Sequence, residues 1–248
     1  ENNTSYEEDF PTDEAIKEEF NSNLKIKLSS TILNNTTTNN FLNNSSRINF
    51  TSNLEKSSRF KFSKINNFNQ YQPEISFFGN NIIFFDNKGS IFKFNDQLKL
   101  VWKKNNYSKS EKKLNPILQL VNNKKYLIVA DNITKYYMMD IFSGEIIWSK
   151  NNIAPFNSQI KIYKDKFFLI DFSNVLRCFS VKDGTELWNI PTENSLIRSQ
   201  KKLSMVIVDD FLYFNNSIGD ISAVDINKGK LLWQLPTQSS LIYESAFS

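Results

Sequence analysis

The chain of 248 residues contains no histidine, one cysteine and six glycines. Without histidine it cannot form a Ser-His-Asp or Cys-His catalytic site, nor a site in which histidine binds zinc or haem. The single cysteine, Cys178, excludes an internal disulfide and any metal site that needs a pair of cysteines. Neither glycine-rich phosphate-binding motif, G-x-G-x-x-G or G-x-x-x-x-G-K-[ST], occurs. These absences exclude much of enzyme chemistry.

Charge is distributed unevenly, and no apolar run approaches the roughly 18–20 residues of a membrane span. Residues 1–20 hold eight acidic residues and one lysine, a net charge of −7, whereas the remainder holds 18 acidic and 29 basic residues, a net charge of +11. The acidic, asparagine-rich start predicts an N-terminal arm over residues 1–46. The other lysines are spread through loops and arginine is scarce, so we predict no nucleic-acid-binding surface.

Four tryptophans recur at intervals of 46, 40 and 45 residues, which indicates an internal repeat. They are Trp102, Trp148, Trp188 and Trp233. In three copies a glycine stands four residues before the tryptophan, at Gly144, Gly184 and Gly229. Glycine suits a left-handed turn between two strands because it has no Cβ. In the first copy Leu98 stands at this position instead.

Four strands fit each repeat. We expect strands over 159–163, 166–172, 175–181 and 186–189 in the third repeat, and over 203–208, 211–215, 220–225 and 230–234 in the fourth. Four strands in a unit of 40–45 residues are typical of a β-propeller blade. A sandwich or open meander is the alternative, but a sandwich seldom repeats a tryptophan so regularly. The prediction is an all-β fold, a β-propeller of four-stranded antiparallel blades, in which each tryptophan packs on a neighbouring blade.

The repeats divide the chain into regions. We predict that 47–248 holds the blades, with four tryptophan repeats over 73–236 and the start of a fifth over 237–248. Alternating fragments around Ile48 and Phe60 favour a hairpin over 47–62 that completes the last blade and removes a sheet edge. An irregular arm is the alternative for this segment.

The segment Ala223–Trp233 resembles the PQQ-like, or quinoprotein-type, repeat, and its recurrence extends the resemblance from about Pro73 to the C-terminus. That family contains quinone-dependent dehydrogenases, non-enzymatic BamB-like scaffolds and lumenal domains of stress-sensor kinases. This sequence most resembles the BamB branch, because an acidic leader precedes compact blades without long insertions. BamB-like proteins have eight blades, so the resemblance implies that this chain is a partial propeller.

The resemblance also implies a partner-binding connector. In BamB-like proteins a leucine–arginine pair in the corresponding connector contacts the barrel-assembly protein BamA, and Ile197 and Arg198 match that pair, with Leu196 as an apolar neighbour. An arginine flanked by aliphatic residues suits a partner contact, because the guanidinium forms bidentate hydrogen bonds while the apolar groups lose water. The next connector of the family is acidic, and Glu244 is the only acid there. Alternatively, Leu196 and Ile197 begin the inner strand of the next blade.

The function expected from the resemblance is that of a non-enzymatic, periplasmic, outer-membrane-associated lipoprotein scaffold. It would dock on BamA, aid the insertion of outer-membrane β-barrels, contact nascent outer-membrane proteins and carry a lipid on an upstream cysteine. No cofactor is expected. The alternative is a PQQ-dependent quinoprotein dehydrogenase, which needs a carboxylate cluster for quinone and Ca²⁺. The repeated acids Asp140, Asp183 and Asp225 fit turns instead, and Cys178 fits a buried, inert thiol. A lumenal sensor, the third hypothesis, would need a membrane span and a kinase downstream.

Overall fold

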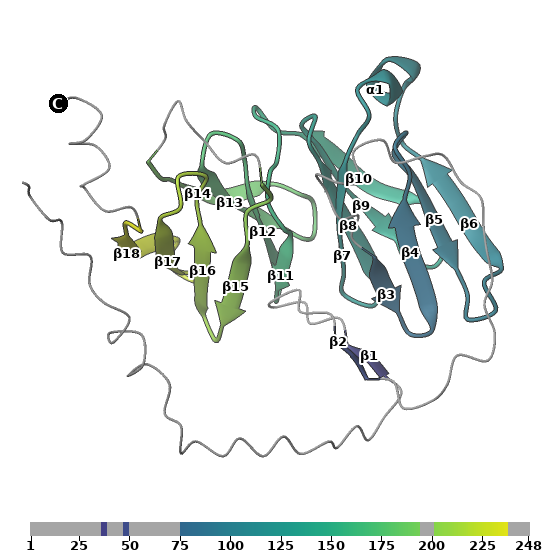
Figure 1. Cartoon of the computed structure of the whole chain (residues 1–248), viewed down its shortest axis with the longest axis horizontal. Coiled ribbons are helices and arrows are strands. Elements are labelled where there is room, and N and C mark those ends of the chain that lie inside the picture. Colours follow the sequence, from purple (N-terminus) through teal and green to yellow (C-terminus); the bar gives the residue numbers. More distant parts are fainter. Residues whose placement is uncertain (1–35, 39–46, 50–74, 194–200, 238–248) are drawn as a thin grey trace, which may run out of the picture.

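The computed structural model describes residues 36–38, 47–49, 75–193 and 201–237, and these ranges are mostly β-structure (Figure 1). Sixteen strands form four antiparallel sheets, each made of four consecutive strands. The first two sheets contain β3 (Ser76–Phe78), β4 (Asn81–Phe85), β5 (Ser90–Phe94) and β6 (Leu100–Asn105), then β7 (Leu118–Asn122), β8 (Tyr126–Asp131), β9 (Lys135–Asp140) and β10 (Ile146–Asn151). The last two contain β11 (Lys161–Tyr163), β12 (Lys166–Ile170), β13 (Val175–Ser180) and β14 (Glu186–Pro191), then β15 (Met205–Val208), β16 (Phe211–Asn215), β17 (Ile221–Asp225) and β18 (Lys230–Leu235).

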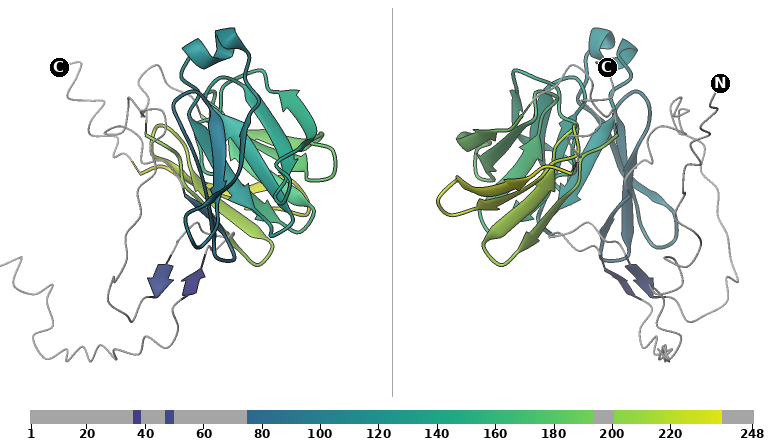
Figure 2. Two further views of the ribbon diagram at one scale, coloured as in Figure 1. Left: turned by 90° about the vertical axis from the view of Figure 1, so that its right-hand side faces the viewer. Right: turned by 60° about the vertical axis from the view of Figure 1, so that its left-hand side comes forward.

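The four sheets are arranged like the blades of a propeller. Their first strands, β3, β7, β11 and β15, contact one another in series, so the sheets share a common inner side (Figure 2). The fourth strand of each sheet forms its outer edge. No sheet within the described residues closes on itself, and the fold is a partial β-propeller. The predicted fold class is therefore confirmed.

The predicted strand ends agree with the observed ones to within two residues in the third and fourth repeats. One of the two-residue differences is at the inner strand β11, which begins at Lys161 rather than residue 159. The preceding backbone pairs with the next sheet instead: Ser158 forms a parallel bridge with Leu203, and the N–H of Gln159 donates to the Leu203 carbonyl at 3.0 Å. The start of this strand therefore connects two blades.

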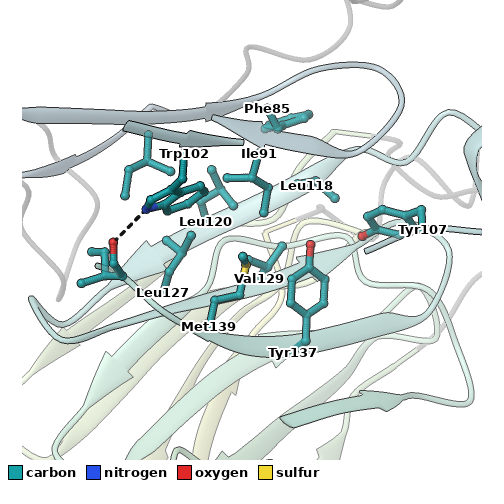
Figure 3. Packing of buried hydrophobic residues seen from close by; sticks show 12 residues of the cluster. Phe85, Ile91, Trp102, Tyr107, Leu118, Leu120, Leu127, Val129, Tyr137 and Met139 are labelled. Carbon is teal, nitrogen blue, oxygen red and sulfur yellow. Dashed lines mark hydrogen bonds between the residues drawn. The ribbon is translucent and has the colours of Figure 1, made fainter. Parts of the chain in front are cut away.

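Hydrophobic cores fill the three spaces between neighbouring sheets. Successive side chains of a strand point to opposite faces, so β8 directs Leu127 and Val129 toward the first sheet and Ile128 and Ala130 toward the third. Figure 3 shows the first of these cores, in which Trp102 of β6 lies over side chains of β7, β8 and β9. Because both faces of the middle sheets are covered, their central strands have nearly continuous apolar sequences.

A short helix, α1 (Lys109–Lys113), lies in the connector between the first and second sheets. Its start is a capping box: the N–H of Glu111 donates to Ser108 Oγ, and the N–H of Ser108 donates to Glu111 Oε2 at 2.7 Å. The described part of the chain holds no helix of the length and apolarity that a membrane span requires.

Two short strands precede the blades. β1 (Thr36–Thr38) and β2 (Arg47–Asn49) pair antiparallel in a sheet of their own. Ile48, from the predicted closing hairpin, thus pairs with Thr37 of the predicted arm. The rest of the hairpin over 47–62, most of the arm over 1–46 and the expected fifth-repeat start after residue 237 lie outside the described residues.

Candidate docking site on the connector face

The connectors between blades lie at one end of the molecule, together with the turns that join the second and third strands of each sheet. The described connector residues are 106–117, 152–160, 192–193 and 201–204. Backbone hydrogen bonds join each connector to such a turn: Asn132 N–H to the Ile117 carbonyl, Asn152 N–H to the Thr134 carbonyl, and Thr192 N–H to the Asn174 carbonyl. We call this end the connector face.

A buried acid or amide closes each turn on this face. The four residues are Asp86, Asp131, Asp171 and Asn216, all at most 1 % exposed. In each, Oδ1 accepts backbone N–H groups of the turn; Asp131, for example, accepts those of Ile133, Thr134 and Lys135 at 2.8 Å. The sequence analysis missed this second repeated feature, although its intervals of 45, 40 and 45 residues nearly match those of the tryptophans.

Two of these carboxylates also hold neighbouring side chains. Asp131 Oδ2 accepts the hydroxyl of Tyr107 at 2.7 Å, which attaches the first connector to the second sheet. Burial raises the pKa of Asp131, although the backbone N–H groups and Tyr107 oppose this shift. Asp171 Oδ2 accepts from Arg177 Nε at 2.7 Å, and the same guanidinium reaches Glu186 through Nη1. The first bond joins a connector to a blade, and the other two hold the third-blade turn and its strands β13 and β14 together.

The connector after Trp188 is held on its near side by Asn174. This residue is fully buried and has a positive φ of 58°. Its Nδ2 donates to the Glu193 carbonyl at 2.9 Å, and its carbonyl accepts both the N–H and the hydroxyl of Thr192. Its Oδ1 accepts the N–H of Ser217 at 3.1 Å, in the turn of the fourth sheet. One side chain therefore joins the third blade, the start of the connector and the fourth blade.

The far side of this connector is held by Asn157. The N–H of Leu203 donates to the Asn157 carbonyl at 2.8 Å, and Asn157 Nδ2 donates to the Lys201 carbonyl at 3.3 Å. Both Asn157 and Leu203 are buried. Residue 193 is thus attached to the third-blade turn and residue 201 to the second connector, and both attachment points lie on the connector face.

The predicted partner-binding residues Leu196, Ile197, Arg198 and Glu244 lie outside the described residues. Their neighbours in the chain do not: Glu193 and Lys201 are both exposed on the connector face. β15 begins at Met205, eight residues after Ile197. The structure thus describes the two attachment points of the connector after Trp188. The contact through Leu196, Ile197 and Arg198 stays a prediction.

The tryptophans lie on the outer strands β6, β10, β14 and β18. The indole of each of the first three lies against the glycine turn of the following sheet: a Cβ built on Gly144, Gly184 or Gly229 would lie 2.6–3.0 Å from the nearest ring atom. The indole N–H of Trp102 donates to the Ile141 carbonyl at 3.3 Å, and that of Trp148 to the Val181 carbonyl at 3.1 Å.

The last two tryptophans depart from this pattern. Trp188 packs on the turn of Gly229, but its buried Nε1 has no hydrogen-bond partner among the described residues. Trp233, which we also expected to be buried, is 46 % exposed and contacts Tyr213 of its own sheet. The reason is geometric: each indole packs on the sheet that follows its own, and no later sheet falls within the described ranges.

The repeated acids and the cysteine of the described residues have structural surroundings. The described residues contain no group of three or more His, Cys, Asp or Glu side chains placed to hold a metal ion. The repeated acids bond to their own turns: Asp140 Oδ1 accepts the N–H groups of Phe142 and Ser143, and Asp225 Oδ1 those of Asn227 and Lys228. Burial raises the pKa of the Cys178 thiol to about 12, so this thiol stays protonated near neutral pH.

The sequence of the blades matches a known protein family. The family model described as "Outer membrane protein assembly factor BamB" matches residues 87–244. The chain belongs to this BamB family. Among curated proteins, none matches the sequence.

Solved structures support the propeller fold. BamB from Moraxella catarrhalis has a TM-score of 0.50 and 16 % identity, over 66 % of this chain and 49 % of that one, so the chain spans about half the length of that protein. The β-propeller domain of Cps50 (Swd1) from Myceliophteria thermophila has a TM-score of 0.54 and 14 % identity, over 75 % and 60 %. The computationally designed protein Ika4 has a TM-score of 0.50 and 10 % identity, over 68 % and 99 %. At these identities the likeness concerns the fold alone.

Proposed function

We propose that this BamB-family chain is a non-enzymatic scaffold of the periplasm. It docks on a BamA-like barrel-assembly protein at the outer membrane through the connector after Trp188, and the residues in contact are Leu196, Ile197 and Arg198. Glu244 in the next connector supplies a second contact, and nascent outer-membrane proteins are a second class of partner. Membership of the family supports the kind of function, and the residues rest on their match to the family's connector.

One structural observation carries the proposal. The connector is attached at both ends, by Asn174 of the third-blade turn at Glu193 and by Asn157 of the second connector at Lys201. A contact residue on such a segment loses less conformational entropy on binding than one on a free loop, because its attachment points are already fixed. The proposed arginine contact also adds charge-assisted hydrogen bonds, which are stronger than neutral ones.

The test is a pull-down with the BamA-like protein from the same source. Arg198→Glu is expected to weaken co-purification at moderate salt and to leave the thermal unfolding temperature unchanged. Lys182→Glu is the matched control, because it makes the same kind of charge reversal at an exposed turn on the opposite end. Unchanged co-purification of the Arg198→Glu variant, or an equal loss in the control, contradicts the assignment of this connector.

A further inference from the structure

We propose that the connector face also carries a binding surface for anionic phospholipid headgroups, built from four lysines and two aliphatic residues. The lysines are Lys88, Lys109, Lys112 and Lys113, and the aliphatic residues are Leu114 and Ile153. We call these six residues the basic patch. The patch does not include residues 194–200, so this inference is independent of the docking contact proposed above.

Contacts between neighbouring segments place the patch on one end of the molecule. Lys88 lies in the first-blade turn, and its carbonyl accepts a hydrogen bond from Asn105 Nδ2, in the last residue of β6 before the first connector. That connector carries α1, which projects beyond the ends of the strands (Figure 1). Lys135, the first residue of β9 after the second-blade turn, reaches Glu111 of α1 at 2.6 Å. The second connector, which carries Ile153, bonds to that turn at Thr134.

The four lysines have no acidic partner. No carboxylate among the described residues lies within ion-pair distance of their ammonium groups, whereas Glu111, the only acid of α1, is engaged by Lys135 and Ser108. The pKa of Glu111 is lowered to about 2, chiefly by the hydrogen bond from Lys135. Its carboxylate is therefore ionised near neutral pH and already bonded to Lys135 and Ser108. The capping box and this ion pair hold α1 in place, with Lys109 and Lys113 exposed and Lys112 partly exposed.

The acids on this face are turned inward. Asp86, Asp131, Asp171 and Asp220 are buried and hydrogen-bonded, and Glu193 is the one exposed acid of the described connectors and turns here. The exposed acids of the described residues otherwise belong to the turns and strand ends at the opposite end, where lysines accompany them. The exposed surface of the connector face is therefore basic while the opposite end is mixed.

Two aliphatic side chains are exposed on the same face. Ile153 is 92 % exposed, the highest value among the large hydrophobic residues described, and Leu114 at the end of α1 is 60 % exposed. They lie on two successive connectors. Exposed aliphatic groups next to lysines suit a lipid surface, because the apolar groups enter the boundary between headgroups and acyl chains while the ammonium groups stay with the phosphates.

The composition of the patch favours lipid over protein or nucleic acid. Protein interfaces are enriched in aromatic residues and arginine and depleted in lysine, and the patch has the reverse composition. Single-stranded nucleic acids are held by aromatic stacking, and the patch has no aromatic side chain. Attraction of lysines to an anionic bilayer requires neither aromatic residues nor arginine. Each lysine near the surface raises binding about fivefold.

The test is co-sedimentation of the full chain with vesicles of phosphatidylcholine that contain either no phosphatidylglycerol or a fixed share of it. Binding is expected to the anionic vesicles only and to fall as salt is raised. The variant with Lys109→Ala, Lys112→Ala and Lys113→Ala should bind about tenfold to 100-fold more weakly. The matched control removes three exposed lysines from the opposite end, Lys99→Ala, Lys182→Ala and Lys230→Ala, and should bind like the parent chain.

Each contrary result overturns the proposal. Binding to neutral vesicles alone, no binding to either kind, or equal loss in both triple variants excludes a specific anionic lipid surface. Binding of a polyanion such as heparin without binding of anionic vesicles assigns the patch to another acidic partner and also overturns the proposal.

A second measurement reports contact directly. The variant Ile153→Cys, labelled with an environment-sensitive dye, should show a blue-shifted emission with anionic vesicles, because Cys178 is buried and leaves one reactive thiol. Phe142→Cys, at an exposed position of the opposite end, should show no shift. Equal shifts at both positions, or none at residue 153, contradict the proposed orientation.

Discussion

The indole of Trp148 lies over Gly184 so closely that a Cβ on this glycine would be 2.6 Å from ring atom Cζ3. The outer strand of one blade thereby contacts the turn of the next blade at a position that accepts no side chain. Gly184 also has a φ of 69°, in the left-handed region. Its backbone conformation and its contact with Trp148 therefore both favour glycine at this position.

Replacing this glycine should separate the two effects. Gly184→Ala is expected to destabilise the chain by about 2–4 kcal/mol, through backbone strain and a clash with Trp148. Gly79→Ala is the control, because Gly79 has a φ of 54° but no heavy atom within 4 Å of an added Cβ, so about 1 kcal/mol of strain remains. Urea unfolding measures both. Equal losses contradict a role for the ring contact.

The tryptophans should differ in their contribution to stability. Trp102 is 8 % exposed, so Trp102→Ala is expected to lower the free energy of unfolding by about 3–5 kcal/mol. Trp233 is 46 % exposed, so Trp233→Ala should cost roughly 1 kcal/mol. The measurement is chemical unfolding followed by circular dichroism, since both variants lose a fluorophore. A large cost for Trp233→Ala would show that a further element packs on it in solution.

Stability near α1 should depend on pH through Glu111. Its pKa in the folded chain is about 2, below the ordinary value of 4.5. Ionised Glu111 therefore stabilises the fold above about pH 4.5, and this contribution is lost as the pH falls toward 2. Glu111→Gln, which can keep the capping hydrogen bond, should be less stable than the parent at pH 7, and the difference should shrink at pH 3. A difference that does not change with pH refutes this assignment.

Asn174 should control the attachment of the docking connector. Asn174→Gly tolerates the positive φ but removes the bonds to Glu193 and Ser217, so it should cost about 2 kcal/mol. Limited trypsin digestion should then cut faster after Arg198. Asn227→Gly, an exposed asparagine in a turn at the opposite end, is the control and should digest like the parent chain. Unchanged cleavage of the Asn174→Gly variant contradicts the proposed anchoring.

Several features of the fold could be predicted because they are local and repeated. The spacing of the tryptophans and the glycines before them defined the blades, and period-two patterns placed the strands within two residues. Even the exception is informative: Leu98, which replaces glycine in the first repeat, has a φ of 56° and so keeps the left-handed turn. The buried acids at Asp86, Asp131 and Asp171 were also open to detection, since they recur at nearly the same intervals.

The features of the candidate site were harder to predict because they join residues far apart in the chain. The bonds of Asn174 to Ser217 and of Asn157 to Lys201 span 43 and 44 residues. Nothing in the local sequence marks these asparagines among the many others. The same holds for Lys135, whose ion pair with Glu111 orients a helix in the preceding connector.

The order of the residues alone determined the four blades that the structure describes, the position of their turns and the class of fold, because hydrophobic alternation and glycine turns act over a few residues. The tertiary structure decided which side chains meet between blades, which acids turn inward and which lysines and aliphatic groups remain on the connector face. These outcomes depend on the angle at which the sheets pack, and that angle is set by side chains from both sheets at once.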